Sequence, residues 1–101
     1  MKGQNMVITI LEAYVEQERW STLKSAFEAA TQSLPPSIAH TFLIQNTNDK
    51  TLWRIMTIWH NREALDEYRR SVETPGGVLM FRAAGAEPSL SIFDMLAQAT
   101  G

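Results

Sequence analysis

The sequence predicts an α+β fold in which a four-stranded antiparallel sheet carries its helices on one face. Three observations lead to this prediction. Four segments are rich in β-branched residues, helical periodicity separates the first from the second and the third from the fourth, and a short polar turn joins the middle two. Because 101 residues is near the commonest domain size, we expect residues 1–101 to form one domain.

The chain begins with a predicted strand at residues 6–15 and a predicted helix at about residues 16–33. The strand, MVITILEAYV, is enriched in β-branched residues and is largely apolar on both of its faces. The pair Pro35-Pro36 ends the helix, because neither proline has a backbone N–H to donate. Four residues fall on one helical stripe and are expected in the core: Trp20, Leu23, Phe27 and Ala30.

A hairpin follows, with predicted strands at residues 38–46 and 51–60. The turn at residues 46–49 reads Asn-Thr-Asn-Asp, and both Asn and Asp accept local hydrogen bonds and tolerate left-handed backbone. Alternation along the second of these strands separates its side chains into two sets. One face carries Leu52, Arg54, Met56, Ile58 and His60, and the other carries Trp53, Ile55, Thr57 and Trp59.

A helix is predicted directly after the hairpin, at residues 62–71. Asn61 is a good N-cap, because its side chain can accept a hydrogen bond from the first helical turn. Asp66 and Arg70 are spaced to form an i, i+4 ion pair. Three residues are expected to face inward: Leu65, Tyr68 and Val72.

The last two predicted elements are a second helix and a closing strand. Thr74 is expected to be the N-cap of a helix whose first residue is Pro75. This helix ends near Gly85, a residue suited to the position after a helix C-terminus. Residues 89–96 alternate in part and are expected to close the sheet.

The resulting order, β-α-β-β-α-α-β, matches the ferredoxin-like βαββαβ arrangement, in which helices cover only one face of the sheet. The first and third strands are nevertheless apolar on both faces. Five such side chains left in water would forgo about 1.5–3 kcal/mol each, and their sum is comparable to the stability of a whole domain, about 5–15 kcal/mol. We therefore expect a homodimer in which a second copy covers the open face, sheet against sheet.

Composition argues against several classes of function. The net charge of −2, without any basic run, offers no footprint for nucleic acid. The absence of cysteine removes disulfides, thiol nucleophiles and most structural zinc sites. The apolar run at residues 6–11 is too short to span a membrane, so no membrane partner is predicted. The expected location is cytoplasmic.

One corner of the chain carries a recognisable motif. Residues 59–65 read Trp-x-x-x-Glu-Ala-Leu, and residues 68–71 read Tyr-Arg-Arg-Ser. Together with the length and the order of elements, this corner resembles the antibiotic biosynthesis monooxygenase (ABM) domain. The resemblance spans nearly the whole chain and implies a dimeric α/β barrel of two ferredoxin-like chains. The family includes cofactor-independent oxygenases of aromatic polyketides or quinols, haem-degrading enzymes and small proteins of unassigned role.

The resemblance also implies site residues. A tryptophan at the position of Trp59 lines a pocket between sheet and helices in such members. Haem-degrading members use an asparagine in the first strand and a later histidine, whereas here Asn5 precedes the strand and no histidine follows residue 60. Haem degradation is therefore not expected. The polyketide-type members place asparagine, tyrosine and arginine around the substrate, which makes Tyr68 and Arg82 the candidates here.

Two functions follow. The first is a cofactor-independent monooxygenase acting on a small aromatic or quinol-type molecule, with Trp59, Tyr68 and Arg82 as catalytic residues and with no cofactor or metal. The alternative is a non-catalytic dimeric small-molecule-binding or accessory protein of the same fold. Trp59 itself has two interpretations, a core side chain or a flat wall for a planar ligand.

The remaining polar residues in apolar strands have structural interpretations. Alternation places His60 on the face opposite Trp59, which favours a surface or dimer contact over a general base. His40 is expected to be a satisfied core or interface histidine, and the two histidines do not predict a metal site. Arg54 interrupts an apolar face, and Glu12 is its expected partner within the chain or across the dimer.

Overall fold

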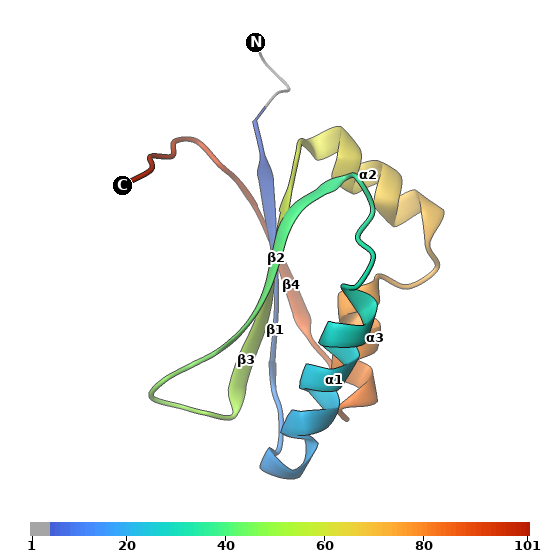
Figure 1. The fold of residues 1–101 in the computed structure, drawn as a ribbon, viewed down its shortest axis with the longest axis vertical. Helices are drawn as coiled ribbons and strands as arrows, with labels where there is room; N and C mark the ends of the chain where they lie inside the picture. Colours follow the sequence, from blue (N-terminus) through green and yellow to red (C-terminus); the bar gives the residue numbers. More distant parts are fainter. Residues whose placement is uncertain (1–4) are drawn as a thin grey trace.

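The computed structural model describes residues 5–101 and places one four-stranded antiparallel sheet under three α-helices (Figure 1). The predicted α+β fold is confirmed, and the predicted boundaries differ from the observed ones by a few residues. The elements are β1 (Val7–Tyr14), the short 3₁₀ helix η1 (Gln17–Arg19), α1 (Trp20–Ala30), β2 (Ile38–Gln45), β3 (Leu52–Trp59), α2 (Arg62–Ser71), α3 (Gly76–Ala83) and β4 (Ser89–Asp94). Within this part of the chain, no helix is long and apolar enough to cross a membrane.

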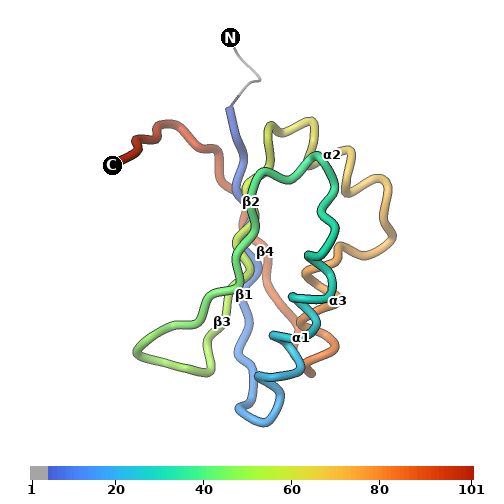
Figure 2. The backbone as a smooth tube through the Cα atoms, viewed as in Figure 1, coloured from blue at the N-terminus to red at the C-terminus, as the bar shows by residue number. Residues whose placement is uncertain are grey.

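The strands lie in the order β2-β3-β1-β4, and every neighbouring pair is antiparallel. The two central strands, β1 and β3, are separated in the chain by a helix and by β2, as the ferredoxin-like arrangement requires. Seen edge-on, the sheet has all three helices on one side (Figure 2). The β2–β3 turn and the segment after β4 extend to the other side.

The core fills the space between the sheet and the helices. Leu23 of α1 and Phe81 of α3 are fully buried there, and Trp20 packs edge-on against Trp53 with ring centroids 5.9 Å apart. Ala30 was expected in this core, but it is exposed and lines a cavity, because α1 ends there before the chain turns toward β2. The face of β3 predicted from alternation is the buried one: Trp53, Ile55, Thr57 and Trp59.

The opposite face of the sheet, called the open face below, is covered by no element among residues 5–101. Phe42 of β2 is 44% exposed there and Phe93 of β4 is 51% exposed. On the two central strands, Arg54 Nε donates to Glu12 Oε1 at 2.5 Å across the β3–β1 pair. The predicted Glu12–Arg54 pair is thus confirmed within one chain, and it interrupts a largely apolar surface.

Different hydrogen bonds define the two ends of α3. Thr74 makes no capping hydrogen bond, contrary to expectation, and Pro75 occupies the N-cap position of a helix that begins at Gly76. The reason is that the Gly76 N–H already donates to the Tyr68 hydroxyl at 2.9 Å. At the other end Gly85 has φ of 76°, as predicted for a glycine following a helix, and its N–H donates to the Arg82 carbonyl.

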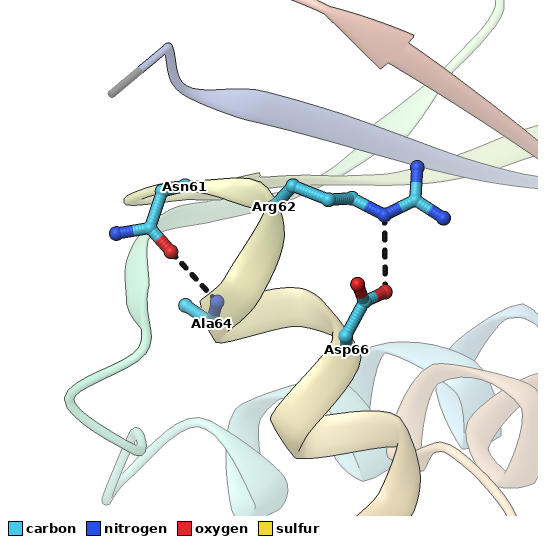
Figure 3. A network of polar contacts seen from close by, with 4 residues as sticks. All are labelled: Asn61, Arg62, Ala64 and Asp66. Atoms are coloured by element: carbon cyan, nitrogen blue, oxygen red, sulfur yellow. Dashed lines mark hydrogen bonds and ion pairs between the residues drawn. The ribbon is translucent and has the colours of Figure 1, made fainter. Parts of the chain in front are cut away.

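The start of α2 confirms one prediction and corrects another (Figure 3). Asn61 Oδ1 accepts the Ala64 N–H at 2.7 Å, which is the predicted N-cap. The predicted pairing of Asp66 with Arg70 is wrong, because Asp66 Oδ1 instead accepts from Arg62 Nε at 3.0 Å. Side chains on a helix lean toward its N-terminus, so the short Asp66 side chain points back toward residue 62.

We predict that Asn61→Ala lowers the free energy of unfolding by about 1 kcal/mol, because it leaves a first-turn N–H of α2 unpaired. Urea denaturation followed by circular dichroism measures this change. The matched control, Arg62→Ala, removes the exposed ion pair one residue later and should cost less than about 0.5 kcal/mol. Equal losses in the two variants would contradict the capping role of Asn61.

Candidate functional site

A cavity of about 450 Å³ lies between the sheet and the helices, within the range of about 300–1,000 Å³ typical of small-molecule sites. It is bounded by β1 and β3 below, by α2 and α3 above, and by the segment between α1 and β2 at one end. Its walls are mostly apolar and include Leu11, Ile38, Ile55, Leu65, Val78 and Met80. All three predicted site residues, Trp59, Tyr68 and Arg82, line this cavity.

Trp59 ends β3 and forms part of the wall. Its side chain is only 5% exposed, and its Nε1 donates to the Thr9 hydroxyl at 3.0 Å. It also packs with Val7 and Leu65 in a small buried cluster. Trp59 thus belongs to a buried cluster and also borders the cavity, and its role as a flat wall for a planar ligand stays a prediction.

Tyr68 packs beside Trp59 in the wall of the cavity. Their ring centroids are 5.0 Å apart, and the ring planes are tilted by 46°. Its hydroxyl accepts the Gly76 N–H, which ties α2 to the start of α3. The next residue allows α3 to approach the sheet closely, because a Cβ on Gly77 would lie 2.6 Å from the Leu11 side chain. These two contacts position the aromatic pair beneath the helices.

Arg82 lies near the end of α3, at the half-exposed rim of the cavity. Its Nε and one terminal nitrogen donate to the two carboxylate oxygens of Glu87 at 2.9 and 3.0 Å. These hydrogen bonds lower the pKa of the Glu87 carboxyl from its ordinary value and raise the pKa of the Arg82 guanidinium. Arg82 thus borders the cavity, but its charge is already paired.

Sequence reasoning missed the polar floor of the cavity. Thr9, Thr57 and Thr41 occupy one row across β1, β3 and β2, because Thr57 pairs in register with both of the others. The Thr41 and Thr57 hydroxyls are hydrogen-bonded at 2.9 Å. We call these residues the threonine row. Alternation alone placed Thr57 beside Trp59, but the row emerges only once the register of all three strands is known. Glu73, between α2 and α3, was also missed and lines the cavity.

Neither histidine reaches the cavity. His60 is exposed, which agrees with its predicted surface position. His40 is exposed on the open face, where its ring stacks on Phe42 with centroids 6.2 Å apart, so the core interpretation was wrong and the interface interpretation stays a prediction. Its position follows from strand pairing, since it lies opposite Ile58 on the face without helices. Residues 5–101 contain no cluster of three or more metal-ligating side chains.

The fold and the cavity together define a ferredoxin-like α+β protein with a largely apolar pocket under its helices. Many solved structures share this fold. A candidate antibiotic biosynthesis monooxygenase from Caulobacter crescentus superposes with a TM-score of 0.70 at 14% identity, covering 94% of this chain and 93% of that one. The cofactor-independent oxygenase SnoaB from Streptomyces nogalater gives 0.65 at 18% identity, covering 95% and 96%.

A third similar structure is a conserved protein of unknown function from Bacteroides thetaiotaomicron, suggested to be an oxidoreductase. It gives a TM-score of 0.69 at 18% identity and covers 91% of this chain and 99% of that one. No family model and no curated protein matches the sequence. The resemblance to ABM domains is thus confirmed at the level of the fold.

The Arg82–Glu87 pair predicts a pH dependence of known sign. Because the pKa of Glu87 is lowered in the folded protein, the pair stabilises the fold above the ordinary carboxyl pKa, and this contribution is lost as pH falls through the lowered value. Arg82→Gln should return the pKa of Glu87 to its ordinary value. An NMR titration of the carboxyl carbon measures this shift, and Arg69→Gln at the same rim is the control that should leave Glu87 unchanged.

Proposed function

We propose that this protein is a homodimeric, cofactor-independent oxygenase that binds a small planar aromatic or quinol-type molecule in the cavity beside Trp59. The observation that carries the proposal is the cavity itself, a roomy and largely apolar pocket whose lining includes several hydroxyl-bearing residues. A filled core at this place would have favoured a purely structural role. The shared fold with SnoaB, a cofactor-independent oxygenase, supports the same class of reaction.

The chemistry proposed for this pocket draws its electrons from the substrate. A ring CH₂ group activated by a neighbouring carbonyl loses a proton, and the resulting carbanion, delocalised as an enolate, reduces O₂ and binds it as a hydroperoxide after reprotonation. Loss of water then leaves a carbonyl, so that CH₂ and O₂ become C=O and H₂O. The protein's part is to exclude water and to hold hydrogen-bond donors where the anion develops.

The lining residues take roles that follow from their positions. Trp59 provides the flat wall against which an aromatic ring packs. The Tyr68 hydroxyl accepts from Gly76 and so keeps its own hydrogen for a substrate oxygen. Arg82 adds positive charge at the rim of the cavity and stabilises the oxyanion of the substrate while it stays hydrogen-bonded to Glu87. Glu73, the other lining carboxylate, is the proposed acceptor of the substrate proton.

The second candidate function is a non-catalytic protein that binds a small aromatic molecule in the same cavity. One observation favours it: the polar groups on the cavity floor are threonine hydroxyls, which do not titrate in the physiological range. The charged lining residues lie in the exposed parts of the chain. Oxygen consumption distinguishes this candidate from the first.

A second copy of the chain is the proposed cover of the open face. The exposed side chains of Phe42, Ile44 and Phe93 make this face apolar over several strands, and monomeric proteins rarely leave such a surface in water. The β2–β3 turn and the segment after β4 both extend to this side, where they would flank a partner (Figure 1). The Glu12–Arg54 pair would be enclosed with its hydrogen bond already made.

We predict that wild-type protein consumes O₂ with an anthrone-like substrate and that Trp59→Ala, in folded protein, abolishes the turnover. An oxygen electrode measures the rate, and circular dichroism verifies the fold, since truncating a buried tryptophan costs about 3–5 kcal/mol. Trp59→Phe keeps an aromatic wall and should retain part of the activity.

The matched control is Trp20→Phe. It removes an indole that also donates one hydrogen bond, to the Val15 carbonyl, but that lies outside the cavity, so the rate should be unchanged. No oxygen uptake by the wild type with any member of a phenol and quinol panel would refute the oxygenase and leave the binding protein as the better candidate.

The proposed homodimer can be tested separately by a charge on the open face. Phe42→Glu puts a charge on the open face, in the middle of β2, and should convert the dimer to monomer, as sedimentation equilibrium can measure. Leu79→Glu is the matched control, because Leu79 is also about half exposed but lies on α3, away from the open face. A wild-type monomer at high concentration would be the contrary result.

A further inference from the structure

The threonine row has more hydrogen-bond donors than the protein uses. The Thr9 oxygen accepts from Trp59 Nε1, and the hydrogen bonds of residues 5–101 provide no acceptor for its own hydrogen. Thr41 and Thr57 share one hydrogen bond, so whichever donates, the other hydroxyl keeps an unused hydrogen. The row therefore offers two O–H donors beneath an apolar cavity.

Packing alone does not account for these hydroxyls. Thr9 and Thr57 are both only 8% exposed, and valine has the same shape without a polar atom. Burying a hydroxyl costs free energy unless hydrogen bonds compensate it. The bond from Trp59 compensates Thr9 in part, and the Thr41–Thr57 bond requires both partners to be present. Three threonines side by side at the floor of a cavity thus point to a ligand that completes their bonding.

We infer that the threonine row binds an acceptor oxygen of the ligand, a carbonyl or a phenolate, and so selects oxygenated aromatic rings over plain ones. This inference rests on the proposed function only in taking the cavity as the ligand site. Thr9 and Tyr68 each accept one N–H group and keep their own O–H free to donate. These free donors favour ligands with acceptor oxygens, such as quinones and aromatic ketones.

The orientation of the ligand follows from the same geometry. The row crosses the sheet under the cavity, whereas Tyr68 and Arg82 belong to the helices above it. A ring with oxygens on opposite edges, such as a para-quinone, can place one oxygen on the row and the other toward Tyr68. Trp59 borders the space between these two positions, where the ring would lie.

The test compares two probes of one size, 1,4-naphthoquinone and naphthalene, by NMR titration of the threonine methyl groups. The chain contains no cysteine, so the quinone cannot form a thiol adduct. Wild-type protein should bind the quinone more tightly. The double variant Thr41→Val/Thr57→Val keeps the shape of the floor but loses two of its three hydroxyls and with them one of the two free donors. Its preference for the quinone should fall about tenfold, the effect of one hydrogen bond.

Two controls separate hydroxyl chemistry from packing. Thr41→Ser/Thr57→Ser keeps both hydroxyls and should retain the preference, and Thr22→Val on the exposed face of α1 should have no effect. If the double valine variant does not fold, Thr41→Ala/Thr57→Ala removes the same two hydroxyls and provides the same comparison.

Three outcomes decide the matter. A preference in the wild type that the valine variant loses supports the inference. Equal binding of both probes, or a preference that survives in the valine variant, overturns it and leaves the aromatic site beside Trp59 intact. Binding of neither probe overturns both the inference and the proposed ligand site.

Discussion

The register between β1 and β3 is the constraint on which the rest of the structure depends. It pairs Val7 with Trp59, Thr9 with Thr57 and Glu12 with Arg54. Because side chains alternate along a strand, a slip of β3 by one residue would move all of its side chains to the other face of the sheet. Arg54 would then lie under the helices, apart from Glu12, and Trp59 and Thr57 would face away from the cavity. The cavity and the apolar open face are thus two results of one pairing.

The sheet could be predicted from the sequence because its signals are local. Alternation along residues 52–59 places Trp59 and Arg54 on opposite faces of the sheet without knowledge of any partner strand. Asn61 marks the start of α2 because its side chain caps the helix. Gly85 likewise marks the end of α3 by a conformation that glycine adopts most easily. The pairing of Arg54 with Glu12 was inferred from the cost of a lone charge on an apolar face, and it is present.

The site was harder to predict because its contacts join distant parts of the chain. The pairing of Thr41 with Thr57 requires the register of two strands, and the bond from Gly76 to Tyr68 requires the angle between two helices. That bond also displaced Thr74 from its expected capping role. Resemblance to a family, and not periodicity, predicts Trp59, Tyr68 and Arg82 as site residues. That they line one cavity depends on tertiary packing, which no pattern in the sequence reveals.

The Glu12–Arg54 ion pair on the open face restricts the kinds of surface that can cover this face. Lipid tails or a detergent micelle would dehydrate Glu12 and Arg54 and return no polar contact, which is expensive for two charges even when they are bonded to each other. A folded surface with its own polar groups at the matching place loses far less. The most apolar face of this protein therefore carries, on its two central strands, a charged pair that disfavours nonspecific hydrophobic association.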